Sequence, residues 1–222
     1  MTKEHVSRET PPAPPAPAAA RGVFSDRLES AERYAELLAS QGVIRGLIGP
    51  RETPRLWERH LLNCAVLGEL LPRDSTVCDI GSGAGLPGVV LAIARPDLTV
   101  TLVEPLLRRT TFLEEAVEVL GLDQVEVVRA RAEELHGRRR FDVVTSRAVA
   151  PLPKLARWSL PLTRPGGTVV AMKGASAQAE VDDARRELRK LGAGPVSVHT
   201  VGVGVVDPPT YAVRVEAPPT RD

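Results

Sequence analysis

The sequence is poor in several features that mark particular classes of protein. Only two cysteines occur in 222 residues, Cys64 and Cys78, and they form neither a C-x-x-C pair nor a disulfide framework. No apolar stretch reaches the ~18 residues of a membrane-spanning helix without a charge or a proline. These absences argue against a disulfide-rich secreted domain and a membrane span, and they favour a reduced, cytoplasmic protein.

Neither sign of charge is in marked excess, and aromatic side chains are scarce. The formal net charge is +1, from 29 basic and 28 acidic residues. A nucleic-acid partner would therefore have to be bound by a local patch and not by a generally cationic surface. Aromatic residues make up 3% of the chain, which argues against a base-stacking platform of several rings. The histidines show no ligand spacing, so we expect no metal site.

Proline, in contrast, is abundant at the N-terminus. It interrupts residues 1–22 throughout, and we interpret this segment as a disordered, partly polyproline-like tail and a poor signal peptide. Two helices are predicted next, one over about 26–40 and one from Thr53 until Pro72. We expect these helices, in residues 23–72, to pack on the domain that follows.

Residues 73–222 alternate between strands and helices. Strands are predicted at 76–80, 98–103, 124–128, 141–145 and 168–172, and helices at 87–94, 106–120, 151–163 and 176–191. This alternation predicts a parallel sheet with helices on both faces. Two further strands, 196–205 and 210–216, are joined by a turn too short for a crossover helix, so they must be antiparallel.

The predicted fold is therefore α/β and Rossmann-like, with N-terminal helices and a mostly parallel seven-stranded sheet that ends in an antiparallel C-terminal hairpin. This is the arrangement of class I methyltransferases that use S-adenosylmethionine. A nicotinamide-binding sheet would have continued in parallel.

Glycines are concentrated after the first predicted strand. Gly83, Gly85 and Gly88 satisfy G-x-G-x-x-G, the dinucleotide fingerprint, and Glu104 follows at the distance expected of a carboxylate that binds ribose hydroxyls. Alone this signal is weak, because a dinucleotide and S-adenosylmethionine both carry an adenosine. Asp79 distinguishes them, since an acid before the glycines would face a methionine ammonium group but repel a pyrophosphate. We therefore favour the sulfonium cofactor.

Two further segments complete the predicted site. Ala132 and Glu133 follow the third strand, where adenine contacts are usual, although they also suit the first turn of a short helix. The fourth strand ends in Ser146, Arg147 and Ala148, which offer neither a general base nor a nucleophile. The methyl acceptor should therefore already own a free lone pair, as guanine nitrogen 7 does.

Arg147 has several possible roles at this edge. A guanidinium group that is hydrogen-bonded to both oxygen 6 and nitrogen 7 of guanine would block methylation of nitrogen 7. If it is functional, Arg147 should contact a phosphate, oxygen 6 alone or the methionine part of the cofactor. The alternative is an ordinary exposed arginine in a loop.

Six stretches together resemble a known family. They are LWERHLLNC (56–64), DIGSGAGLPGVVLAIARP (79–96), RRTTFLEE (108–115), RAEEL (131–135), SRAVAPLPKL (146–155) and GGTVVAMKG (166–174). They are similar to the ribosomal RNA small-subunit methyltransferase G family, also called glucose-inhibited division protein B. The resemblance implies methylation of guanine nitrogen 7 in 16S ribosomal RNA near the decoding region, with S-adenosylmethionine as methyl donor. Residues 42–52 depart from the polar segment usual in the family and resemble its actinobacterial branch.

The resemblance and the residues together define a candidate site. Carried over by position, the resemblance implies cofactor contacts at Gly81, Leu86, Ala132, Glu133 and Arg147. The residues themselves add Asp79, Gly83, Gly85 and Glu104. The cationic candidates for RNA contact are Arg108, Arg109, Lys154 and Lys173, of which Lys173 is favoured because it follows the fifth strand at its carboxyl end. His60 is either a substrate-binding residue or a satisfied, half-buried histidine.

Two other functions stay open on this reading. One is a small-molecule methyltransferase on the same fold, which would normally carry a lid or a catalytic base. The other is a non-enzymatic protein that binds RNA or a cofactor and retains the glycine loop for folding.

Overall fold

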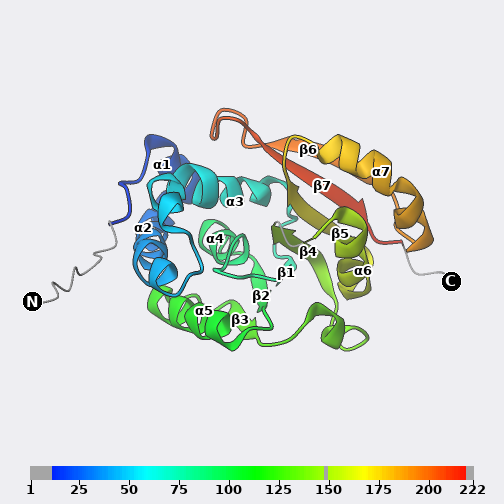
Figure 1. Ribbon diagram of the computed structural model, residues 1–222, viewed down its shortest axis with the longest axis horizontal. Coiled ribbons are helices and arrows are strands. Elements are labelled where there is room, and N and C mark those ends of the chain that lie inside the picture. The colour runs from blue at the N-terminus through cyan, green and yellow to red at the C-terminus, as the bar shows by residue number, and fades with distance from the viewer. Residues whose placement is uncertain (1–11, 148–149, 219–222) are drawn as a thin grey trace, which may run out of the picture.

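The computed structural model describes residues 12–147 and 150–218, and it contains one seven-stranded sheet (Figure 1). The strands are β1 (Thr76–Ile80), β2 (Thr99–Val103), β3 (Val125–Val128), β4 (Phe141–Arg147), β5 (Thr163–Lys173), β6 (Val196–Val201) and β7 (Thr210–Glu216). Their order across the sheet is β3-β2-β1-β4-β5-β7-β6. Strands β1 to β5 pair in parallel, and β7 is antiparallel to both β5 and β6. The predicted fold class is confirmed.

The strand order places the functional edge of the sheet. From β1 the chain proceeds outward through β2 and β3, and it then returns to place β4 on the other side of β1. Ligands of open α/β sheets bind beyond the carboxyl ends of the strands at such a reversal. Ile80 and Arg147 end the two central strands, so the glycine loop and the segment after β4 both leave the sheet at this point.

Helices cover both faces of the sheet. One face carries α1 (Ala18–Phe24), α2 (Leu28–Leu37), α3 (Asn63–Ala65), α4 (Gly88–Ala94) and α5 (Leu107–Leu120). The other carries α6 (Leu152–Ser159) and α7 (Ala177–Lys190). Figure 1 shows the N-terminal helices gathered around α4, on the opposite side of the sheet from α6 and α7. The N-terminal helices thus share one apolar core with α4.

Short 3-10 and π-helical segments are frequent on both faces of the sheet. They are η1 (Ser25–Arg27), η2 (Leu38–Gly42), η3 (Pro50–Arg55), η4 (Leu56–Leu62), η5 (Val66–Leu70), η6 (Ala132–Leu135) and η7 (Leu160–Leu162). The single helix that we predicted from Thr53 to Pro72 is therefore a succession of η3, η4, α3 and η5. Pro54 lies inside η3 and has no main-chain N–H, so regular α-helical bonding cannot run through it.

The structure differs from our expectation of a disordered tail where it describes part of that tail. Ala18 begins α1, Ala20 is fully buried, and the indole N–H of Trp57 donates a hydrogen bond of 2.8 Å to the carbonyl of Pro14. Composition was misleading here because alanine is small enough to fill a close contact between a helix and the core. The remaining residues, 1–11, lie outside the described part of the chain.

In the described ranges, no helix combines the length and apolar character that crossing a membrane requires. Cys64 and Cys78 are both buried free thiols.

Candidate functional site

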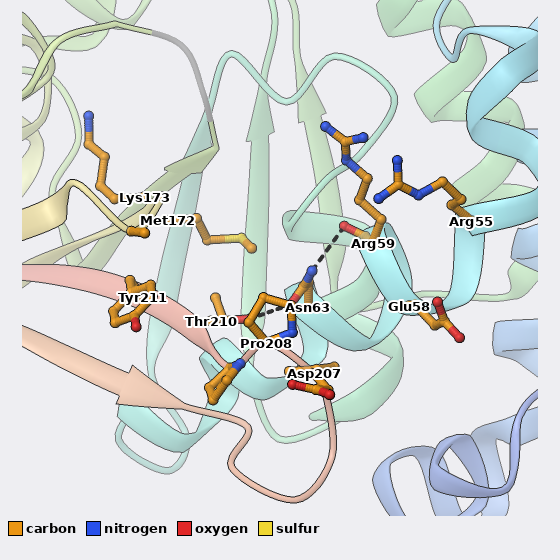
Figure 2. A pocket seen from close by; sticks show the side chains of 14 residues that line it. Arg55, Glu58, Arg59, Asn63, Met172, Lys173, Asp207, Pro208, Thr210 and Tyr211 are labelled. Carbon is orange, nitrogen blue, oxygen red and sulfur yellow. Dashed lines mark hydrogen bonds between the residues drawn. The ribbon is translucent and has the colours of Figure 1, made fainter.

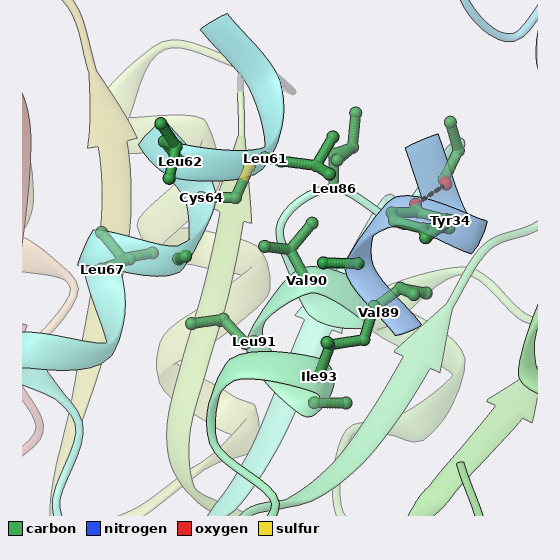
Figure 3. Packing of buried hydrophobic residues seen from close by; sticks show 14 of the residues in the cluster. Tyr34, Leu61, Leu62, Cys64, Leu67, Leu86, Val89, Val90, Leu91 and Ile93 are labelled. Carbon is green, nitrogen blue, oxygen red and sulfur yellow. Dashed lines mark hydrogen bonds between the residues drawn. The ribbon is translucent and has the colours of Figure 1, made fainter. Parts of the chain in front are cut away.

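The loop after β1 is held from two sides. Gly85 has φ of 91°, and a Cβ there would lie 2.5 Å from Cγ2 of Val89 and 2.7 Å from the hydroxyl oxygen of Tyr34. The Tyr34 hydroxyl donates a hydrogen bond to the carbonyl of Ala84, so α2 fixes the loop that α4 supports (Figure 3). Only glycine fits this close approach. The predicted cofactor residues in and beside the loop are Asp79, Gly81, Gly83, Gly85, Leu86 and Glu104.

Asp79 lies in β1 and is fully buried. Its Oδ2 accepts a hydrogen bond of 3.0 Å from the main-chain N–H of Gly88, whereas its Oδ1 is buried with no partner in the described part of the chain. Burial raises the pKa of the Asp79 carboxyl to about 7, although the N–H of Gly88 and the charge of Arg147 lower it. An unpartnered buried oxygen requires an explanation, and a cationic ligand group that donates hydrogen bonds fits it.

Glu104 follows β2 and is 1% exposed. Its Oε2 accepts from the N–H of Gly83 at 3.0 Å and from Nη1 of Arg109 at 3.3 Å, and its Oε1 accepts from the N–H of Leu106 at 3.1 Å. Glu104 thus ties the glycine loop to the start of α5. A carboxylate has about four acceptor sites, so Glu104 retains capacity for a ligand hydroxyl.

A cavity of about 140 Å³ lies beside the glycine loop. Its lining includes Gly81, Val103, Pro105, Ala132, Glu133 and Trp158. The walls are mainly apolar, which suits an aromatic base. The structure thus brings Ala132 and Glu133 to the cavity, and it also places them in the short helix η6, the alternative that we considered. Trp158 was missed: it lies in α6, three residues after the stretch 146–155, and no local pattern indicates that its ring reaches the end of β1.

Arg147 lies at the end of β4 and contacts the N-terminal helices. Its Nη1 is 2.8 Å from Nδ1 of His60, 3.4 Å from the carbonyl of Arg59 and 3.9 Å from Sγ of Cys64. The Nε2 of His60 is 2.9 Å from Oε2 of Glu52. These contacts join the helical segment η4 to the end of β4. We call this part of the sheet, at the carboxyl ends of the central strands β1 and β4, the reacting edge. Ala148, which we also considered there, lies outside the described residues.

The titratable groups around Arg147 offer little chemistry of their own. Both nitrogens of His60 have hydrogen-bond partners. Burial raises the pKa of the Cys64 thiol to about 11 and the pKa of Tyr34 well above its usual value. At neutral pH these side chains supply neither a thiolate nor a free general base.

A second cavity, of about 380 Å³, is shown in Figure 2. Its lining includes Arg55, Arg59, Asn63, Met172, Lys173 and Tyr211. It lies between η4 and the turn that precedes β7, and Figure 2 shows the two arginines and Tyr211 on opposite sides. Met172 is the register partner of Arg147 across β4 and β5, which places this cavity at the reacting edge. We call it the β5 groove.

The four cations that we predicted for RNA contact lie on three elements, α5, α6 and β5. Arg108 is exposed, and the neighbouring Arg109 is paired with Glu104. Lys154 has its Nζ 5.0 Å from the ring centroid of Trp158.

Lys173, the favoured cation, is engaged inside the protein. Its side chain is 12% exposed, and its Nζ lies 2.7 Å from Oε1 of Glu180 and 3.1 Å from the carbonyl of Ala150. This pairing leaves the ammonium group little capacity for a phosphate. Arg55 and Arg59, which are exposed on the β5 groove, were missed, although their spacing of four residues places them on one face of a helix.

The strand order, the antiparallel β7 and the glycine loop at the end of β1 define a methyltransferase of the Rossmann-like class. A solved structure of this class, described as M. jannaschii TYW2 in complex with AdoMet, superposes with a TM-score of 0.55, covering 73% of this chain and 76% of that chain at 15% identity. At that identity the likeness concerns the fold alone.

Sequence comparison defines the family. The family model GidB, rRNA small subunit methyltransferase G, matches residues 27–206. The ribosomal RNA small subunit methyltransferase G of Nocardioides sp. is 63% identical over 213 residues, covering 96% of this chain and 84% of the relative. Its counterpart in Thermobifida fusca is 63% identical over 197 residues, covering 89% and 83%. This chain belongs to the rRNA small subunit methyltransferase G family, which confirms the predicted resemblance.

Proposed function

We propose that this protein transfers a methyl group from S-adenosylmethionine to ring nitrogen 7 of a guanine in 16S ribosomal RNA. Membership of a family described as rRNA small subunit methyltransferases supports the reaction class and the RNA substrate. The choice of nitrogen 7 as the acceptor atom rests on one observation: His60 and Cys64 at the reacting edge offer no free base.

The residues around the glycine loop suit S-adenosylmethionine. The unpartnered Oδ1 of Asp79 fits the methionine ammonium group, Glu104 fits the ribose hydroxyls, and the cavity beside Ala132 and Glu133 fits the adenine. The backbone of the loop at Gly81, Gly83, Gly85 and Leu86 would pass alongside the cofactor. When bound, the cofactor supplies an electrophilic methyl group on a cationic sulfur.

The groups at the reacting edge favour an acceptor that needs no deprotonation. His60 has both nitrogens engaged, and Cys64 stays protonated because it is buried. His60 and Cys64 thus supply position and not proton abstraction at this edge. Guanine nitrogen 7 is unprotonated at neutral pH and reacts once it is aligned with the methyl group. An exocyclic amino group would have to lose a proton.

The β5 groove supports an RNA approach from the side of η4. Arg55 and Arg59 supply cations for phosphates, and Tyr211 supplies one aromatic face for a base. Because Arg59 and Met172 line the groove and both adjoin Arg147, a strand of RNA in this groove would present a base to the carboxyl edge of β4.

The proposal is tested by mapping 7-methylguanosine in 16S ribosomal RNA from a strain that lacks the gene. We expect one position to lose the modification and to regain it when the wild-type gene is returned, but not with Arg147→Ala. An unchanged map in the deletion strain would remove the proposed reaction. Calorimetry separates the cofactor classes, because binding of a nicotinamide nucleotide without binding of S-adenosylmethionine would contradict the proposal.

A further inference from the structure

Three side chains form a hydrogen-bonded row at the reacting edge. Glu52 lies in η3, His60 in η4 and Arg147 at the end of β4. Glu52 Oε2 is 2.9 Å from His60 Nε2, and His60 Nδ1 is 2.8 Å from Arg147 Nη1. His60 is 6% exposed, so water competes little for either bond.

The chemistry of the row fixes where the imidazole carries its proton. A guanidinium group has five N–H donors and no acceptor, so Nδ1 of His60 must accept from Arg147. The proton of the neutral ring therefore sits on Nε2 and is donated to the carboxylate of Glu52. Histidine is well suited to this position, because one ring offers a donor and an acceptor on opposite sides.

The charged groups around His60 agree with a neutral ring. They are Glu52 from η3, Arg59 from η4 and Arg147 from β4. Burial and the charge of Arg147 lower the pKa of His60 to about 4, against the bond to Glu52. A second proton would sit on Nδ1, facing an N–H of Arg147, and would break that contact.

The row leaves most of the guanidinium available. The contacts of Arg147 within the described ranges all involve Nη1, so Nε–H and the Nη2 hydrogens take no part in the row. A free arginine side chain rotates about several bonds, so one held through Nη1 presents its remaining donors in a defined direction.

We propose that His60 is a positioning residue: held by Glu52 as the Nε2–H tautomer, it fixes Arg147 so that the remaining N–H groups bind an anionic oxygen of a ligand. This inference rests on the proposed function, which places the ligands at this edge. The anion is a carboxylate or a phosphate, and two sources are possible, the methionine carboxylate of the cofactor and the RNA backbone.

The ring tautomer is measured without any methyl transfer. Nitrogen-15 NMR of the full chain at pH 7 should show His60 with a protonated Nε2 and an unprotonated Nδ1, and Arg147→Ala should shift the Nδ1 signal. A proton on Nδ1 would overturn the proposal, whatever the protein methylates.

Paired variants separate positioning from a general structural role. Glu52→Gln keeps an acceptor for Nε2–H, and His60→Asn keeps an acceptor near the position of Nδ1. Glu52→Ala and His60→Gln remove these groups in turn. We expect Glu52→Gln and His60→Asn to bind ligands nearly as the wild type does. Glu52→Ala and His60→Gln should lose about tenfold or more in affinity, as loss of a charge-assisted hydrogen bond does. Thermal unfolding shows that each variant is folded.

Three probes distinguish the two anions. If Arg147 binds the methionine carboxylate, the weakened variants lose affinity for S-adenosylhomocysteine but not for 5′-methylthioadenosine, which lacks the amino acid. If it binds a phosphate, they lose affinity for a single-stranded RNA oligonucleotide and keep both nucleosides. Either pattern supports the proposal. Equal affinity of all variants for all three probes would overturn it.

Discussion

Asp79 shows how a single buried acid couples the candidate cofactor site to stability. Its pKa is about 7 in the folded protein, mainly because of burial, against the ordinary value of 3.8. The folded state therefore binds a proton that the unfolded state has already lost between these values. The stability that Asp79 contributes is fully present below about pH 4 and is lost as pH rises through 7.

Replacement by asparagine tests this effect. Asp79→Asn keeps an oxygen for the N–H of Gly88 but does not titrate. We expect the free energy of unfolding of the wild type, relative to Asp79→Asn, to fall by on the order of 4 kcal/mol between pH 4 and pH 7.5. Urea unfolding at several pH values measures this free energy for both proteins. His60, whose pKa is lowered on folding, has the opposite effect on stability, but it is present in both proteins and cancels when the variant is subtracted from the wild type. A difference that stays flat or rises with pH would contradict the burial of an uncompensated carboxyl.

At the scale of elements, Arg95 holds the end of the N-terminal helices to α4. It directly follows α4, and its Nη1 donates to the carbonyls of Gly68 and Leu71 at 2.8 and 3.2 Å. Asp97 binds its Nε and Nη2 at 2.7 and 2.6 Å. Arg95 thus gives a charged donor to carbonyls at the end of η5, where Gly68 also accepts from the N–H of Leu71.

We expect Arg95→Ala to lower the free energy of unfolding by about 1–2 kcal/mol, because buried carbonyls lose a charged donor that is itself partly exposed. Arg185→Ala is the matched control. Arg185 pairs with Asp182 on α7 with both side chains more than half exposed, 62% and 52%, so its loss should change stability by less than about 0.5 kcal/mol. Denaturant titration compares the two, and equal effects would show that Arg95 does not cap η5.

The strands were more predictable than the helical segments, for physical reasons. A parallel strand that is buried on both faces is a continuous apolar run between turn residues, and β1 and β2 lie within a residue of their expected bounds. The antiparallel β7 also has its expected bounds. β6 ends at Val201 and not at 205, because Gly202 and Gly204 both adopt positive φ. The irregular run from Pro50 to Leu70 depends on tertiary packing, which periodicity alone does not reveal.

In the candidate site, too, some residues could be predicted from local sequence patterns and others depend on tertiary packing. Asp79 and Glu104 were predicted from local patterns: Asp79 directly precedes the glycine loop, and Glu104 follows it at the spacing of a ribose-binding carboxylate. The contact between His60 and Arg147 joins residues 87 positions apart, and no local pattern signals it. Lys173 was expected to bind RNA, but Glu180, on the helix that follows β5, holds its ammonium group. Sequence indicates which cations are present, whereas packing decides which of them are available.

At the scale of the whole molecule, the near-zero net charge of +1 means that RNA affinity must come from a few local contacts. We expect Arg55→Ala to weaken the binding of a single-stranded RNA oligonucleotide and to make its salt dependence shallower by about 0.7 to 1 in log K against log salt, the contribution of one phosphate contact. Fluorescence anisotropy over a range of salt concentrations measures this slope.

Arg186→Ala is the control for this measurement, since Arg186 is exposed on α7, on the other face of the sheet. It should leave the slope unchanged. Equal slopes for Arg55→Ala and the wild type would exclude the β5 groove as the phosphate-binding surface.

The bond from Tyr34 to the carbonyl of Ala84 spans 50 positions of the chain, and it has a consequence for how the protein is made. Residues up to Leu70 emerge from the ribosome before α4 does, so the apolar faces of α1 and α2 at first have no sheet or helix to cover. Exposed apolar surface of this kind is prone to aggregation. The earliest part of the nascent chain must therefore remain unfolded in water, or be shielded by a chaperone, until the residues that complete its core have emerged.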